Sequence, residues 1–122
     1  MPRVDRNNYC RFEEKQFFDK VRDYCEESKF KIDIPKDTKL GANIILSKGD
    51  AKIALHIFWS RNCEKNVDVN SIYAAVAAKE HYRCTSALVV TNSHFVETAL
   101  DLARALNCKT IARDQLLDLS NL

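Results

Sequence analysis

The side chains best suited to chemistry in this sequence are cysteines and histidines, and their spacing restricts what they can do. The five cysteines are Cys10, Cys25, Cys63, Cys84 and Cys108. Their number is odd and no two form a CxxC pair, so the sequence indicates neither a disulfide framework nor a zinc site. Cys63 follows His56 closely, and the two could form a nucleophile–base pair, although closeness in sequence does not establish one.

Basic residues are the second group with a chemical use. The chain has 19 Lys and Arg against 17 Asp and Glu, a formal charge of +2, which is too small to indicate a polyanion partner unless the charges cluster. They gather weakly over residues 29–65, which predicts either a solvated surface or a shallow phosphate-facing patch. In the second case we expect DNA to contact Lys36, Lys39, Lys48, Lys52, Arg61 and Lys65.

Hydropathy patterns predict the elements that must position these groups. After a flexible N-terminus over 1–9, helical spacing predicts a helix over 10–28, and alternation predicts strands over 30–34, 42–47 and 52–59, the last two forming a hairpin. Asp68 is expected to cap a second helix and Ser93 a third, on either side of the buried strand SALVVT. A short strand, KTIA, and helical turns from Arg113 complete the chain.

The resulting order, α-β-β-β-α-β-α-β-α, predicts one α/β domain over 10–122, with a mixed β-sheet flanked by helices on both faces. The length of 122 residues and the 46% hydrophobic content fit a single folded domain. No apolar run approaches the roughly 18–20 residues of a membrane helix, and the N-terminus lacks a signal sequence. We therefore expect a cytoplasmic protein that does not bind membranes.

Two C-terminal segments carry a family pattern. Thr91-Asn92-Ser93, Phe95 and Ala99 follow the buried strand, and Arg113-Asp114-Gln115-Leu116-Leu117 follows the last strand. This pattern resembles the catalytic domain of Mrr-like type IV restriction endonucleases, in the PD-(D/E)XK nuclease superfamily. The resemblance implies a restriction-endonuclease-like fold and a Mg²⁺-dependent site that cleaves DNA. That site has an aspartate on the second strand, and a Glu or Gln, one residue and a Lys on the third.

The sequence departs from this site at every key position. Asn43 stands at the aspartate position, and His56 and Phe58 stand where the carboxylate or amide and the lysine belong. An amide oxygen is a weak Mg²⁺ ligand, and a phenyl ring cannot replace an ammonium group. The resemblance therefore implies that the catalytic site is not intact, that no cofactor is bound, and that Phe58 fills the former cleft. His56 is then a hydrogen-bonded packing histidine.

The sequence leaves three functions open. The first is an inactive nuclease-fold domain that binds DNA weakly, or a protein, in a restriction, phage or mobile-element context. The second is an active Mg²⁺-dependent endonuclease with a relocated site, for which the candidates are Glu13, Glu14, Lys79 and Glu80. The third is a protein-interaction module that binds a host factor through Trp59 and the neutralised cleft. The resemblance also allows a homodimer.

Overall fold

A computed structural model describes residues 10–36 and 41–116 of the chain. The predicted flexible N-terminus, Lys39 and the helical turns expected beyond Leu116 lie outside these ranges. The elements, in order, are α1 (Glu14–Glu27), β1 (Lys31–Asp33), β2 (Ile44–Lys48), β3 (Ala51–Phe58), η3 (Arg61–Cys63), α2 (Val69–His81), β4 (Ser86–Thr91), α3 (Glu97–Ala105) and β5 (Cys108–Ile111). No helix within the described ranges has the length and apolarity needed to cross a membrane.

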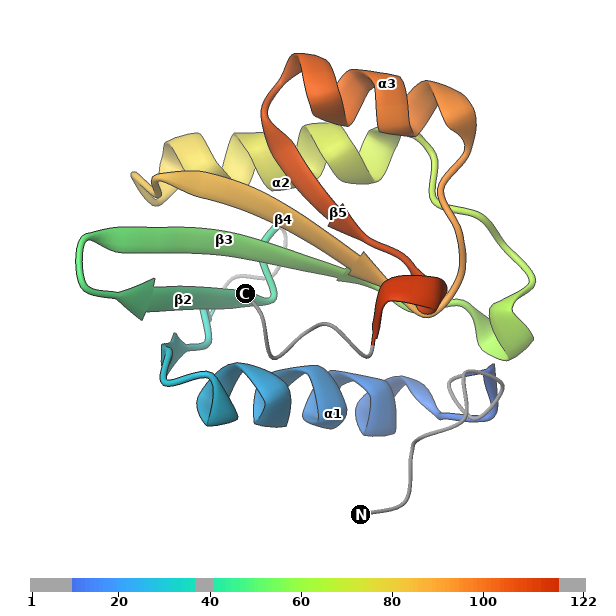
Figure 1. Ribbon diagram of the computed structural model, residues 1–122, viewed down its shortest axis with the longest axis horizontal. Coiled ribbons are helices and arrows are strands. Elements are labelled where there is room, and N and C mark those ends of the chain that lie inside the picture. The colour runs from blue at the N-terminus through green and yellow to red at the C-terminus, as the bar shows by residue number, and fades with distance from the viewer. Residues whose placement is uncertain (1–9, 37–40, 117–122) are drawn as a thin grey trace.

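The strands form one mixed sheet in the order β1-β2-β3-β4-β5. β1, β2 and β3 pair antiparallel, whereas β3, β4 and β5 pair parallel. Helix α1 covers one face of the sheet, and α2 and α3 cover the other (Figure 1). The predicted mixed α/β sheet of the restriction-endonuclease-like type, with helices on both faces, is confirmed.

Each face of the sheet has its own core. On the first face, Phe17 and Val21 of α1 pack on Leu46, Leu55 and other strand residues. On the second face α2 buries Ile72 together with the small side chains of Ser71, Ala75 and Ala78, and the glycine before β2 lies against that helix. Gly41 has φ +85°, and a Cβ atom at this position would overlap the backbone carbonyl of Ala74. The close approach of chain and helix therefore requires glycine at 41.

The N-termini of α2 and α3 show where a capping residue could be predicted from the local sequence and where it could not. Asp68 caps α2 as predicted, because its carboxylate accepts a hydrogen bond from the Asn70 N–H at 2.9 Å. The prediction that Ser93 caps α3 is wrong, since that helix has Val96 at its N-cap. Val67 holds the intervening chain extended, because it donates to the His94 carbonyl at 2.8 Å and accepts from the Val96 N–H at 3.0 Å. These hydrogen bonds to a distant segment keep the chain extended after Ser93, so α3 begins later than the capping pattern predicts.

The cysteines correct a second prediction. Cys10 and Cys63 form a disulfide across 53 positions of sequence, which removes Cys63 as a nucleophile for His56. The sequence pattern could not show this pairing, because the fold alone brings the start of α1 beside η3. Cys25 and Cys108 are free and buried, and burial raises the pKa of each thiol to about 11.

The Cys10→Ser variant tests this disulfide. A cross-link over this length of chain restricts the unfolded state, so its loss should lower the free energy of unfolding by about 2–4 kcal/mol under non-reducing conditions. Urea unfolding measures this difference with and without dithiothreitol, which should abolish it. The control Cys84→Ser alters a free, half-buried thiol and should change stability by less than about 1 kcal/mol. Equal stability of the wild-type protein in both buffers would contradict the disulfide.

Candidate functional site

A pocket of about 460 Å³ opens between the start of α1 and the end of β3. It contains the three positions at which the sequence departs from the family pattern, Asn43, His56 and Phe58. Its remaining walls come from Glu14, Lys15, Phe18, Ile57 and Trp59. The fold therefore brings the three substituted positions into one site.

The pocket exists because β3 is longer than its neighbour β2. The last pair of the β2–β3 ladder is Ile44 with Leu55, whereas β3 continues beside β4 as far as Phe58. The end of β3 therefore has an edge without a paired strand. Asn43 covers that edge, because its Oδ1 accepts a hydrogen bond from the Ile57 N–H at 2.6 Å. The amide at the family's aspartate position thus links the residue before β2 to the end of β3 by a hydrogen bond.

His56 is also held by the backbone. Its Nδ1 lies 2.7 Å from the Gly41 carbonyl oxygen, and since a carbonyl only accepts, Nδ1 carries the proton and donates it. Burial lowers the pKa of His56 below its ordinary value of 6.5, and the bond to Gly41 opposes this shift. The ring is therefore neutral near pH 7, with Nε2 as an acceptor. The prediction of a hydrogen-bonded packing histidine agrees with this arrangement.

Phe58, the last residue of β3, and its neighbour Trp59 point to opposite faces of the sheet. Phe58 packs against the α2–α3 core, and Trp59 packs against the α1 core. The indole Nε1 donates to the Phe12 carbonyl at 2.9 Å, which holds the ring over the start of α1. Phe58 lines the pocket without closing it, so the expectation that this side chain fills the former cleft is not met.

The first helix supplies one of its two predicted acids to the pocket. Glu14 lines it, whereas Glu13 is the N-cap of α1, where its N–H donates to Gln16 Oε1 at 2.8 Å. Lys15 also lines the pocket, and its ammonium lies 3.2 Å from the Asp19 carboxylate.

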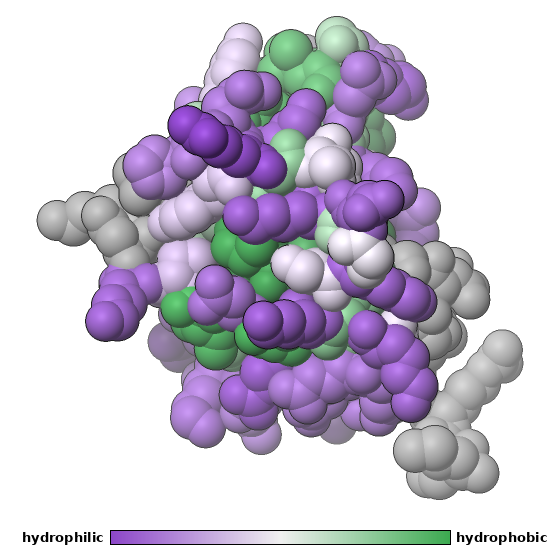
Figure 2. Space-filling model, turned by 90° about the vertical axis from the view of Figure 1, so that its left-hand side faces the viewer, coloured by the Kyte–Doolittle hydropathy of each residue, from purple (hydrophilic) through white to green (hydrophobic). Residues whose placement is uncertain are grey.

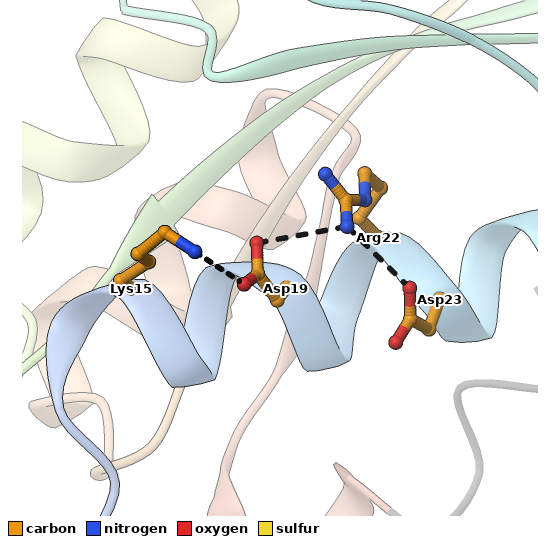
Figure 3. A network of polar contacts seen from close by, with 4 residues as sticks. All are labelled: Lys15, Asp19, Arg22 and Asp23. Carbon is orange, nitrogen blue, oxygen red and sulfur yellow. Dashed lines mark hydrogen bonds and ion pairs between the residues drawn. The ribbon is translucent and has the colours of Figure 1, made fainter.

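Asp19 is shared with a second cation of α1. Its other oxygen lies 3.7 Å from Arg22, which also lies 3.7 Å from Asp23, so a chain of exposed ion pairs follows the outer face of the helix (Figure 3). Lys15 and Phe18 were not predicted from the sequence as pocket residues. Their three-residue spacing on the predicted helix, next to Glu14, could have indicated them.

Lys79 and Glu80, the other candidates for a relocated site, lie at the opposite end of the sheet. They stand in the last turn of α2, close to the start of β3. Lys52 at that start donates from Nζ to the Tyr82 carbonyl at 2.8 Å, just after the helix ends. Six positions of β3 separate Lys52 from Phe58, a span of about 20 Å. The structure does not bring Lys79 or Glu80 to the pocket.

The basic residues of segment 29–65 separate into two groups. Lys48 and Lys52 lie at the β2–β3 hairpin end, a largely hydrophilic face of the molecule (Figure 2). Both ammonium groups are bonded to the protein, Lys48 to the Ser28 carbonyl at 3.0 Å and Lys52 to that of Tyr82. Lys36 is exposed just after β1.

Arg61 and Lys65 form the second group and lie at the other end of β3, beside the pocket. They line a smaller hollow with Trp59, Ser60 and the acidic Glu64, and the Arg61 guanidinium stands 5.9 Å from the centre of the indole ring. Their charges therefore face the same side of the molecule as the pocket.

The family's Thr-Asn-Ser segment fixes the loop that carries these two cations. Asn92 is fully buried and bonds both backbone groups of Ser60, accepting from its N–H and donating to its carbonyl, each at 2.8 Å. Ser93 donates to the Cys63 carbonyl at 3.2 Å. The motif thus acts as scaffold, and it holds the loop after β3 against the end of β4.

The residues of the pocket do not fit the Mg²⁺ that the fold family implies. Glu14 is the one carboxylate among the described residues that line it, and the Asn43 oxygen already accepts a backbone hydrogen bond. Within the described ranges, no three His, Cys, Asp or Glu side chains are grouped so as to hold a metal ion. Because magnesium sites rest on carboxylate oxygens, this set of side chains supports no catalytic step through that metal.

Comparisons with known proteins agree with this fold. Residues 10–120 match the family model Mrr_cat, described as restriction endonuclease. Two solved structures are similar: a protein of unknown function, AF1548 (TM-score 0.65, 14% identity), and the DNA modification-dependent restriction endonuclease AspBHI (TM-score 0.64, 13% identity). The matches cover 78% and 98% of this chain, but 56% and 35% of those chains. Among curated proteins no similar sequence was found.

The family match extends over nearly the whole described chain, and the fold agrees with it. This protein therefore belongs to the Mrr-type restriction endonuclease catalytic-domain family. It spans about half the length of one structural relative and about a third of the other.

The lowered pKa of His56 predicts a pH-dependent stability. The unfolded chain binds a proton to this ring more readily than the folded chain does, so the free energy of unfolding should fall as the pH drops below about 6.5. Urea unfolding between pH 5 and pH 8 measures the slope, and His56→Gln should flatten it. His81→Gln, at the exposed end of α2, should keep the wild-type slope. An unchanged slope in His56→Gln would show that this ring is not held neutral.

Proposed function

We propose that this chain is an inactive restriction-endonuclease domain that binds DNA and does not cleave it by the family's Mg²⁺ mechanism. The observation that carries the proposal is the content of the pocket. Asn43, His56 and Phe58 occupy the family's catalytic positions there, and two of these side chains are bonded to the backbone instead. A nuclease needs charged oxygens to hold the metal and an amine near the attacking water, and the three positions provide neither.

DNA binding is supported by the fold family and by the cations beside the pocket. Lys15, Arg61 and Lys65 lie on the same side of the molecule, and Arg61 and Lys65 make no salt bridge among those found in the described chain. Such groups are free to neutralise phosphates. Lys48 and Lys52 are bonded to backbone carbonyls at the other end, so we assign the contacts to the pocket side. The net charge of +2 predicts weak binding at physiological salt.

The two alternatives have less support. A relocated nuclease site that combines Glu14 with Lys79 or Glu80 is disfavoured, because α2 carries the last two to the opposite end of the sheet. A protein-interaction module would need a continuous apolar surface. The large hydrophobic side chains exposed in the described ranges are Ile34 and Tyr73, and single exposed residues of this kind are ordinary on protein surfaces.

A cleavage assay tests the loss of catalysis. The wild-type protein should leave plasmid and single-stranded DNA intact in Mg²⁺ and Mn²⁺, at the level of a buffer control. The triple variant Asn43→Asp, His56→Glu, Phe58→Lys restores the family's residues and should give cutting that EDTA abolishes, provided that circular dichroism shows it folded. EDTA-sensitive cutting by the wild-type protein that His56→Ala removes would refute the proposal.

A binding assay tests the assignment of the cations. Each phosphate contact releases counterions. The double variant Arg61→Ala, Lys65→Ala should therefore weaken DNA binding about tenfold, and the slope of the binding constant against salt should fall by the equivalent of about two phosphate contacts. The matched control Lys48→Ala, Lys52→Ala removes the same charge at the hairpin end and should keep the wild-type salt slope. Fluorescence anisotropy over a series of salt concentrations measures both. If only the hairpin pair mattered, the DNA surface would lie at that end.

A further inference from the structure

The pocket has aromatic walls suited to a flat ligand. Phe18 comes from α1, and Phe58 and Trp59 come from the end of β3. All three rings are half-buried, and the bond from Trp59 Nε1 to Phe12 fixes the indole in place. A volume of about 460 Å³ lies within the range of small-molecule sites. Stacking on such rings is a common way to bind unpaired bases.

The polar side chains of the pocket have fixed and complementary roles. Asn43 uses its oxygen on the Ile57 N–H, which orients the amide and leaves Nδ2 as a donor with no partner among the described residues. His56 uses its Nδ1 proton on the Gly41 carbonyl, which leaves Nε2 as an acceptor, again with no partner in the described chain. Besides the charged groups of Glu14 and Lys15, the pocket therefore offers one uncharged donor and one uncharged acceptor.

We propose that this pocket binds a single unpaired DNA base, stacked on the aromatic walls and hydrogen-bonded at its edge by Asn43 Nδ2 and His56 Nε2. Every base has a π face and an edge with a donor beside an acceptor, so the chemistry matches. The lining suits a base better than a phosphate, because the Glu14 carboxylate offsets the Lys15 ammonium and the other lining side chains are uncharged. This inference rests on the proposed DNA binding and specifies which part of the DNA enters the former catalytic site.

Trp59 is the one tryptophan of the sequence, so its fluorescence reports directly on the pocket. Titration with deoxyadenosine or thymidine, which carry no phosphate, should quench this emission in a saturable way, with excitation beyond the absorption of the bases. Deoxyribose, the matched probe without a base, should leave it unchanged. Absence of saturable quenching at millimolar nucleoside would overturn the proposal, and so would equal quenching by deoxyribose.

Two pocket variants and one control locate the binding. Phe58→Leu replaces one aromatic ring of the pocket with an aliphatic side chain, and His56→Phe removes the Nε2 acceptor. Each variant should weaken nucleoside binding at least about fivefold. Tyr73→Leu alters an aromatic side chain that is 55% exposed on α2, away from the pocket, and should bind as the wild type does. Thermal unfolding confirms that each variant is folded. If Tyr73→Leu reduced binding as much as the pocket variants did, the base would not lie in the pocket.

A single-stranded oligonucleotide separates this inference from the proposed function. The wild-type protein should bind an all-base strand several times more tightly than a strand of abasic residues with the same phosphates, and Phe58→Leu should reduce that preference. If both strands bind equally, the base pocket is refuted while DNA binding stands. If neither strand nor duplex DNA binds, the proposed function itself fails.

Discussion

The hydrogen bond between the Asn43 amide oxygen and the Ile57 N–H is the interaction on which the site depends. β3 runs beyond the start of β2, so its last residues expose an unpaired edge. An exposed backbone N–H at such an edge needs a partner, and the side chain of Asn43 provides it at 2.6 Å. This bond links the residue before β2 to the end of β3, and it holds Asn43 in the wall of the pocket.

The same bond shows that an asparagine can make the architectural contact at this position. An asparagine oxygen accepts a backbone hydrogen bond as a carboxylate oxygen does, so the architecture does not require the charge. His56 is placed by a backbone carbonyl in a similar way. The groups that a metal and an attacking water would require are absent from these positions, whereas the bonds that shape the pocket remain.

The loop after β3 shows how distant segments build one side of the molecule. Asn92, buried at the end of β4, holds Ser60 by two hydrogen bonds, and the Cys10–Cys63 disulfide joins the start of α1 to the same loop. The Trp59 indole N–H also donates to the carbonyl of Phe12, just before α1. These contacts fix the loop that carries Arg61 and Lys65 beside the pocket. Cations from α1 and from this loop can then face one ligand.

Sequence alone determined the order of helices and strands as far as β5, the Asp68 cap and the family, because hydropathy period, capping and motif residues are local properties. Tertiary structure alone decided that Cys10 meets Cys63, that Val67 delays α3 beyond Ser93, and that Glu14 reaches the pocket whereas Lys79 and Glu80 do not. It also divided one basic segment between two ends of β3. Such outcomes depend on the lengths of the strands and on the path of the chain between them. These features bring together residues far apart in sequence, and no local pattern encodes them.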